Sequence, residues 1–260
     1  MLTIDPFPNL DDIKKYYPDD YHGFTSHHYF LIKKLKAWYW KYKVIRYSQF
    51  ITNGEKILEV GCGKGDLLGE FRNRGFKQIF GLDFNAVAVQ SARANGFEVH
   101  HGLLDTETYP QRNFNLIIIE NLIEHVLDPL SFLQSCHELL DKGGLIVGET
   151  PNINSWDCKL FGKYWGGYSA PMHLYLLNEE NIKQLAEKSG FKIRQIKNTL
   201  QPVHWALSIQ HYIQHNLFKA RLNNGRSAYF SLLLLFFIPI SMFQSIVSNS
   251  STVQFVLEKK

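Results

Sequence analysis

One short segment constrains the fold of this chain more than any other. It runs from Ile57 to Asp66 and reads Ile-Leu-Glu-Val-Gly-Cys-Gly-Lys-Gly-Asp. The mostly apolar run Ile57–Val60 predicts a buried β-strand, and the glycines after it predict a tight turn. Glycine adopts left-handed backbone conformations and lets a ligand approach the main chain without meeting a Cβ. We therefore expect a strand–turn–helix unit with a ligand site at the turn.

The spacing of the glycines narrows the choice of ligand. Gly61, Gly63 and Gly65 give the pattern GxGxG, whereas a dinucleotide fingerprint needs its third glycine where Asp66 stands. The carboxylates of Glu59 and Asp66, on either side of the turn, would repel a pyrophosphate. They favour a ligand that carries positive charge, such as a sulfonium with an ammonium group.

A second acidic residue follows at the end of the next predicted strand. Asp83 stands in Gly81-Leu-Asp-Phe-Asn85, about 20 residues after the glycine turn, where a carboxylate accepts hydrogen bonds from both ribose hydroxyls. Together with Glu59 and the glycine turn, Asp83 predicts a ligand with an adenosyl group.

The rest of the chain between residues 55 and 200 alternates short β-branched runs with longer amphipathic runs. This alternation is typical of βαβ units around a parallel sheet. Phe114–Glu120 is apolar almost throughout, as a central strand covered on both faces should be. The predicted strands are Lys56–Val60, Gln78–Asp83, Glu98–Gly102, Phe114–Glu120, Leu145–Glu149, Phe191–Asn198 and a final Thr252–Glu258.

Helix boundaries are also legible. Three predicted helices stop at a glycine followed by phenylalanine, at Gly75, Gly96 and Gly190, because glycine tolerates the left-handed C′ position. Asp128, followed by proline, and Asn178, followed by two glutamates, are predicted N-caps.

The domain organisation follows from this pattern. Residues 1–50 predict an N-terminal cap and helix, and residues 51–200 with 251–260 predict the α/β core. Residues 201–250 predict an apolar helical insert before the last strand. In the N-terminal helix, 3- and 4-residue spacing predicts one packed apolar face formed by Leu31, Leu35, Trp38, Tyr42 and Ile45.

The insert contains the one membrane-like stretch, Tyr229–Val247. Its apolar centre is shorter than the ~20 residues of a spanning helix, and a single crossing would leave the final strand on the wrong side of a bilayer. Two hypotheses stay open: an apolar cap or dimer contact, and peripheral membrane contact through residues 219–247. Lys219, Arg221 and Arg226 would favour an anionic surface.

Composition adds few constraints. The net charge of +4 requires no nucleic-acid partner, and three cysteines without a CxxC pair favour a reducing compartment. The acidic N-terminus does not resemble a secretory signal. We expect a cytoplasmic location, with peripheral contact at the inner face of a membrane as the alternative.

Four segments carry a resemblance to a known family. ILEVGCGKG, GLDFN, IIIENLIEHVLDP and LLDKGGLIVGETPN resemble the class I S-adenosylmethionine-dependent methyltransferases, and most closely the broad group that includes ubiquinone-biosynthesis O-methyltransferases. The resemblance covers residues 55–200 and the terminal strand. It implies a Rossmann-like, doubly wound, mostly parallel seven-stranded sheet with an antiparallel last strand, and S-adenosylmethionine as methyl donor.

The resemblance also implies roles for individual residues. The methionine moiety is assigned to the glycine turn and the carboxylate before it: Glu59, Gly61, Cys62, Gly63 and Gly65. The adenosine is assigned to Asp83 at the ribose, Phe84 and Leu104 beside the adenine, and Asp105 near its amino group. Glu120 and Asn121 would close the floor near the transferred methyl.

Two histidines are candidates for catalysis. Methyl transfer to a hydroxyl requires the removal of a proton, a role that suits histidine near neutral pH. His125 and His173 follow the fourth and fifth predicted strands, at the sheet edge where open α/β folds bind ligands. The alternative is that both only shape the pocket. A divalent metal on Glu120, Glu124 and His125 is chemically possible but not favoured.

The predicted function is methylation, with O-methylation of a small lipid-like, quinone or saccharide acceptor favoured over N- or C-methylation. One alternative is a non-catalytic partner protein of the same fold. A nucleic-acid methyltransferase is less favoured, because Glu120-Asn-Leu-Ile123 stands where amino-methylating DNA enzymes carry an Asn/Asp-Pro-Pro-aromatic motif.

Overall fold

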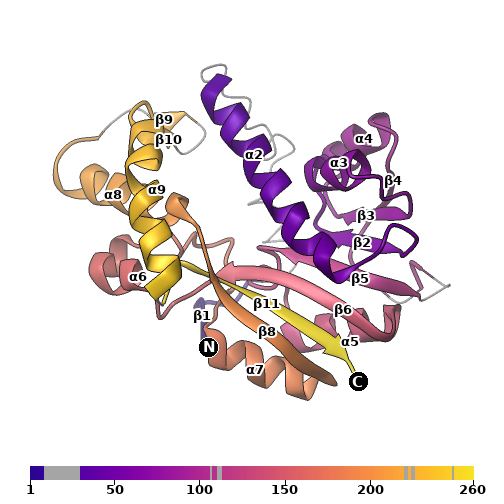
Figure 1. Cartoon of the computed structure of the whole chain (residues 1–260). Helices are drawn as coiled ribbons and strands as arrows, with labels where there is room; N and C mark the ends of the chain where they lie inside the picture. The colour runs from indigo at the N-terminus through magenta and orange to yellow at the C-terminus, as the bar shows by residue number, and fades with distance from the viewer. Residues whose placement is uncertain (9–29, 106, 110–112, 220–221, 224–225, 248) are drawn as a thin grey trace.

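The computed structural model describes residues 1–8, 30–105, 107–109, 113–219, 222–223, 226–247 and 249–260. Its centre is a seven-stranded sheet with the order β4-β3-β2-β5-β6-β11-β8 (Figure 1). The strands are β2 (Ile57–Val60), β3 (Ile79–Asp83), β4 (Glu98–His101), β5 (Phe114–Glu120), β6 (Leu140–Pro151), β8 (Phe191–Thr199) and β11 (Thr252–Lys259). Only β11 is antiparallel to its neighbours β6 and β8 in this sheet. The predicted fold class is confirmed.

The strand boundaries agree with the predicted ones to within one residue, except at β6. This strand begins at Leu140 rather than Leu145, directly after helix α5 (Pro129–Leu139). Leu140 pairs with Phe114, and the register then shifts before the regular ladder resumes at Leu145. An irregular pairing of this kind leaves no alternating pattern in the sequence.

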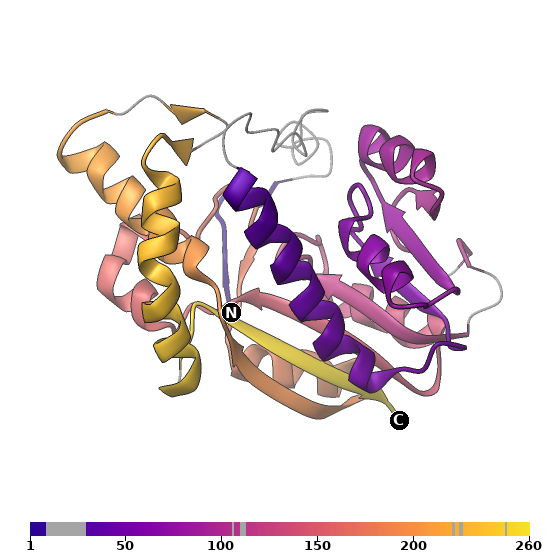
Figure 2. The same ribbon diagram turned by 45° about the horizontal axis from the view of Figure 1, so that its top comes forward.

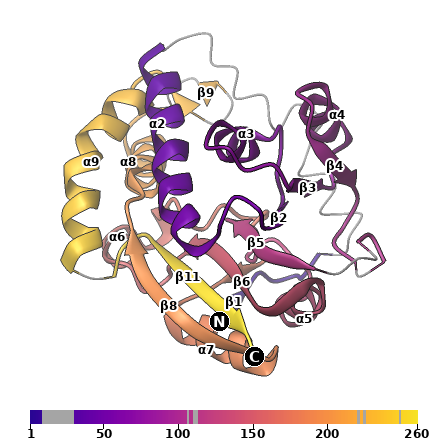
Figure 3. The ribbon, with the colours of Figure 1, turned by 45° about the vertical axis from the view of Figure 1, so that its right-hand side comes forward.

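Helices cover both faces of the sheet (Figure 3). On one face lie α2 (Phe30–Tyr47), α3 (Asp66–Asn73) and α4 (Ala86–Ala94); on the other lie α5 and α7 (Glu179–Lys188). Apolar residues of β2, β5 and β6 point alternately into the two cores, since each strand is covered on both sides.

The predicted helix boundaries are present. Gly75, Gly96 and Gly190 have positive φ angles of 93°, 79° and 86° directly after the helix ends. Asp128 accepts hydrogen bonds from the amides of two residues in the first turn of α5, and Asn178 forms a capping box at the start of α7.

The predicted packed face of the N-terminal helix is wrong where the structure describes side chains. Trp38 and Ile45 are 58% and 54% exposed, and Tyr42 is also exposed. The buried residues of α2 are instead Lys43, Val44 and Tyr47. The physical reason lies outside the helix, in a pair of buried carboxylates described below. The side chains of Leu31 and Leu35 lie outside the described residues.

The remaining elements surround one end of the sheet. α8 (Pro202–Asn216) and α9 (Phe230–Val247) lie side by side next to the β8 edge, with a core of their own (Figure 2). The shorter elements are α6 (Trp156–Phe161), η1 (Ser48–Phe50), η2 (Gly162–Tyr164), and the paired strands β1 (Leu2–Thr3) with β7 (Tyr175–Leu176) and β9 (Leu222–Asn223) with β10 (Arg226–Ser227).

Candidate functional site

The glycine turn lies between β2 and α3 at the carboxyl edge of the sheet. Gly61, Gly63 and Gly65 have φ angles of 77°, 53° and 81°, which residues with a Cβ rarely adopt. A Cβ on Gly65 would also lie 2.9 Å from the ring of Phe97. The turn therefore requires glycine for its shape.

Asp83 ends β3 beside this turn and is buried. Its Oδ2 accepts a hydrogen bond of 2.8 Å from the amide of Gly63, and its Oδ1 accepts one of 2.8 Å from the amide of Asn85. These contacts fix the carboxylate, and each oxygen keeps a second lone pair for a hydroxyl donor. The geometry fits a ribose.

Glu59, the third residue of β2, is buried with one unsatisfied oxygen. No described residue hydrogen-bonds to its Oε2. Burial raises the pKa of Glu59 well above its usual value, and the carboxylates of Glu120, Asp66 and Asp83 raise it further. A buried acid among other acids is stabilised by a bound cation. This orphaned oxygen fits a ligand with an ammonium or sulfonium charge.

The other residues predicted to bind the cofactor differ in how far they are buried. The thiol of Cys62 packs in the core, 2.7 Å from where a Cβ on Gly81 would lie, so it does not face a ligand. Phe84 is 36% exposed and follows Asp83, Leu104 is half-buried against the core, and Asp105 is exposed.

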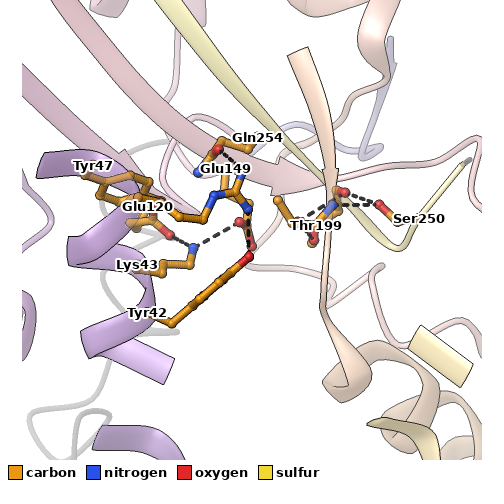
Figure 4. A network of polar contacts seen from close by, with 10 residues as sticks. Tyr42, Lys43, Tyr47, Glu120, Glu149, Thr199, Ser250 and Gln254 are labelled. Carbon is orange, nitrogen blue, oxygen red and sulfur yellow. Dashed lines mark hydrogen bonds and ion pairs between the residues drawn. The ribbon is translucent and has the colours of Figure 1, made fainter. Parts of the chain in front are cut away.

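Glu120, at the end of β5, is engaged by α2 (Figure 4). Its two carboxylate oxygens accept hydrogen bonds from Lys43 Nζ and from the hydroxyl of Tyr47. Lys43 Nζ also lies 3.0 Å from Oε2 of Glu149, on the neighbouring strand β6. The amide of Asn121, whose φ of 46° is left-handed, donates to the carbonyl of Glu149. The structure thus gives Glu120 a cation from within the chain.

The charges of this network are set by burial and proximity. Burial lowers the pKa of Lys43, but the two carboxylates outweigh that effect and hold it well above its usual value. Burial, followed by the charge of Glu120, raises the pKa of Tyr47 well above its usual value. Lys43 is therefore a buried ammonium and Tyr47 a neutral donor. Neither Lys43 nor Glu149 was predicted as a site residue. The one signal for them in the sequence is the pair of acids, Glu120 and Glu149, at the ends of two neighbouring buried strands.

The structure brings the two predicted histidines together. The ring centroids of His125 and His173 lie 4.6 Å apart in an edge-to-face arrangement. Nδ1 of His125 lies 2.9 Å from the carbonyl oxygen of Met172, and Nδ1 of His173 lies 2.9 Å from that of Gly167. Because a carbonyl only accepts, each Nδ1 carries the proton and each Nε2 is the basic nitrogen.

Burial keeps both rings neutral. It lowers the pKa of His125 to about 4 and that of His173 well below its usual value, the latter with a further contribution from His125. Two neutral imidazoles therefore lie at this edge of the sheet near neutral pH.

Glu124 completes this group. Its Oε2 accepts a hydrogen bond of 2.9 Å from Thr150 Oγ1, while no described residue hydrogen-bonds to Oε1. Burial raises the pKa of Glu124 to about 8. Glu124, His125 and His173 each offer one ligand atom, and these atoms lie within 4.8 Å of one another. These three residues could hold a divalent cation. The sequence had offered Glu120, Glu124 and His125 as metal ligands, and in the structure His173 rather than Glu120 joins the other two.

The acidic turn and the histidine group lie at the same edge of the sheet. The glycine turn follows β2, and Glu124 and His125 follow the neighbouring strand β5. The carboxyl ends of parallel strands are where open α/β folds bind ligands.

Comparison with known proteins agrees with this geometry. A family model described as a methyltransferase domain matches residues 32–196. A protein of Mycolicibacterium smegmatis named as an S-adenosylmethionine-dependent methyltransferase is 28% identical over 158 residues, 59% of this chain and 57% of the relative. A ubiquinone biosynthesis O-methyltransferase of Ruegeria is 28% identical over 176 residues, 60% of this chain and 68% of the relative.

The fold has solved counterparts. A crystal structure of an S-adenosylmethionine-dependent methyltransferase from Archaeoglobus fulgidus superposes with a TM-score of 0.57 at 19% identity and covers 89% of this chain and 100% of that one. The chain matches 57% and 68% of the lengths of the two sequence relatives. Since the family model spans more than half of the sequence, this chain belongs to the methyltransferase-domain family, which uses S-adenosylmethionine as the methyl donor.

Proposed function

We propose that this chain transfers the methyl group of S-adenosylmethionine to a hydroxyl of a small lipid-like, quinone or saccharide acceptor. The observation that carries the proposal is the pair of neutral, Nδ1-protonated imidazoles of His125 and His173 beside the acidic turn. The distant relative named as a ubiquinone biosynthesis O-methyltransferase supports a hydroxyl acceptor.

The donor is held by charge and by shape. Glu59 supplies an unsatisfied carboxylate oxygen for the positive charge of the methionine moiety, Asp83 accepts hydrogen bonds from the ribose, and the glycine turn lets the ligand approach the backbone. Holding donor and acceptor in line converts a bimolecular displacement into a step within one complex.

The reaction needs one proton removed. The acceptor oxygen attacks the methyl carbon, the carbon–sulfur bond breaks, and the sulfonium leaves as a neutral thioether. As the new bond forms, the hydroxyl becomes a strong acid and gives its proton to Nε2 of an imidazole. An imidazole with a lowered pKa suffices as the base, because it is unprotonated at neutral pH and accepts the proton only in the transition state.

A second candidate assists the same step with a metal. The clustering of ligand atoms of Glu124, His125 and His173 favours it. A divalent cation held there would lower the pKa of a bound acceptor hydroxyl. Both candidates place the hydroxyl at the same group of side chains.

The test uses the full chain with radiolabelled S-adenosylmethionine and two prenylated acceptors, a catechol and its amine analogue. We expect label in the extracted catechol, as an O-methyl group by mass spectrometry and NMR. Transfer only to the amine or to carbon would contradict the proposal. A chelator separates the two candidates, because loss of activity that is restored by added Mg²⁺ or Zn²⁺ would favour the metal.

Two variants test the histidines against a matched control. His125→Gln and His173→Gln should each lower kcat by about 10²-fold or more and leave the affinity for S-adenosylmethionine within about twofold. His215→Gln, on the exposed end of α8, should retain full activity. An unchanged kcat in both histidine variants would mean that neither histidine acts as the base.

A further inference from the structure

The polarity of α9 is reversed relative to an ordinary surface helix. A surface helix buries its apolar side and exposes its charges. In α9 the strongly exposed positions are all apolar, at helical spacing along its whole length: Leu232, Leu235, Phe236, Pro239, Met242, Phe243, Ile246 and Val247. Two of its polar residues, Ser241 and Gln244, are fully buried.

Hydrogen bonds fix this orientation. Ser241 Oγ accepts from the amide of Gln201 at 2.9 Å, at the start of α8. Gln244 Nε2 donates to Oδ1 of Asp157 at 3.0 Å, and Gln244 Oε1 accepts from Nε1 of Trp205 at 2.8 Å. Rotating the helix to bury its apolar side would break all three contacts and leave buried polar groups unpaired. The outward apolar side is therefore built into the fold.

The apolar surface continues onto α6. Leu160 is 68% exposed and Trp156 is 37% exposed, and the rings of Trp156 and Phe243 lie 6.4 Å apart. Leu160 stands four residues after Trp156 and so shares its side of the helix. We call the exposed residues of α9 together with Trp156 and Leu160 the apolar face. An exposed apolar surface of this extent marks a contact with a membrane or another protein.

The elements that carry the apolar face have few acidic residues. The sequence contains no aspartate or glutamate from Lys188 to Leu257. The one acid of α6, Asp157, is buried and bonded to Trp165 and Gln244. Lys159 and Lys163, beside Leu160, are exposed. Among the described residues of α6, η2, α8 and α9, the exposed charges are basic. An apolar face carried by such elements is complementary to an anionic surface, whereas two copies of it would bring like charges together.

The topology sets how α9 can meet a membrane. Among the described residues it is the helix long and apolar enough to cross one, but only 22% of it is buried, unlike a core helix. It packs along α8 at one side, and its chain leads into β11, which lies between β6 and β8 in the sheet. Both ends thus remain with the domain, so the helix lies along a surface rather than through it.

We propose that the apolar face docks this chain on an anionic phospholipid bilayer, with α9 parallel to the membrane plane. The side chains of Leu232, Phe236, Phe243 and Ile246 enter the boundary between headgroups and acyl chains, and the lysines of α6 and η2 contact lipid phosphates. The proposal does not depend on the reaction that the chain catalyses.

The test is flotation of the detergent-free full chain with vesicles of phosphatidylcholine containing phosphatidylglycerol. We expect the chain to float with these vesicles and to bind pure phosphatidylcholine more weakly. Leu232→Glu with Ile246→Glu, at positions 70% and 82% exposed, should lower the bound fraction about tenfold. Val87→Glu is the matched control on α4, where an exposed apolar residue becomes acidic far from the apolar face.

Unchanged circular dichroism and S-adenosylmethionine affinity would show that the double variant is folded. A wild-type chain that stays in the soluble fraction overturns the proposal, as does equal binding by the double variant. Sedimentation velocity tests the alternative that a second copy of the chain covers the apolar face. A wild-type dimer that does not bind vesicles, together with a monomeric double variant, would make the apolar face an interface between two copies.

Discussion

Asp83 uses both carboxylate oxygens on backbone amides before any ligand is bound. Asp83→Asn keeps the size of the side chain but replaces one accepting oxygen with a donor that faces an N–H group. We expect the dissociation constant for S-adenosylmethionine to rise by about tenfold to a hundredfold, which corresponds to about 1.4–2.8 kcal/mol. Isothermal calorimetry measures it. Asp141→Asn, at an exposed position of β6, is the control and should bind like the parent. Equal affinities of Asp83→Asn and the parent would mean that Asp83 does not bind the ligand.

Glu124 and His125 give stability opposite dependences on pH. The pKa of Glu124 is raised from 4.5 to about 8, so its contribution to stability is present below pH 4.5 and is lost as pH rises through 8. The pKa of His125 is lowered from 6.5 to about 4, so its contribution is present above pH 6.5 and is lost as pH falls through 4. The free energy of unfolding therefore falls through Glu124 as pH rises and through His125 as pH falls.

The variant Glu124→Gln isolates the first of these effects. Between pH 4.5 and 8, the free energy of unfolding of the parent should fall relative to the variant by at most about 1.4 kcal/mol per pH unit. Urea unfolding of the metal-free protein, with chelator present, measures both curves. Parallel curves would mean that Glu124 is ionised in the folded state.

Single residues were predictable from sequence where their role is local. The glycine turn and the helix caps depend on neighbours a few residues away, and the structure contains them as the sequence indicated. Asp83 was predictable because it ends the strand after the glycine turn, and its carboxylate accepts a hydrogen bond from Gly63 in that turn. His125 and His173 were predictable together because the carboxyl ends of parallel strands share one edge. Their ring contact was not, because it depends on the loop before His173. Cys62 was predicted less well. Its position in the glycine turn is compatible both with a ligand contact and with a core side chain, and the structure places its side chain in the core.

The helix α2 is held on the sheet by a buried charge. Lys43→Met should destabilise the chain by about 3–5 kcal/mol, because Glu120 and Glu149 would then lie buried beside each other without a cation. Lys41→Met, on the exposed side of the same helix, should change stability by less than about 0.5 kcal/mol. Urea unfolding near neutral pH compares them. Equal effects of both changes would mean that Lys43 is dispensable to the fold.

The same network explains why the packed face of α2 was predicted wrongly. Periodicity counts apolar side chains, and Trp38, Tyr42 and Ile45 gave a regular stripe. The face that packs was selected instead by Glu120 and Glu149, which lie far along the chain and need an ammonium within reach. No pattern within the helix contains that information. The strands were predictable because two covered faces leave an apolar run.

At the scale of the whole molecule, the apolar face and the histidine group are joined by a chain of buried contacts. Gln244 of α9 donates to Asp157, and Asp157 accepts a hydrogen bond of 2.6 Å from Nε1 of Trp165. The loop after Trp165 includes Gly167, whose carbonyl orients the ring of His173. A helix proposed to lie on a membrane thus positions the loop that carries a proposed base, which suits an acceptor that arrives from lipid.

This connection predicts the effect of Gln244→Leu. The leucine fills a similar volume but leaves Trp205 Nε1 without its acceptor and Asp157 with one donor fewer. We expect a loss of about 1–3 kcal/mol in the free energy of unfolding. Peptides covering residues 162–173 should also exchange their amide hydrogens faster by mass spectrometry, because the loop loses a fixed anchor. Ser245→Ala, which removes only a contact within α9, should leave that exchange unchanged. If loop exchange in Gln244→Leu equals that of the parent while stability falls, α9 and the loop of His173 are independent, and the proposed contact of α9 with a membrane does not act on that loop.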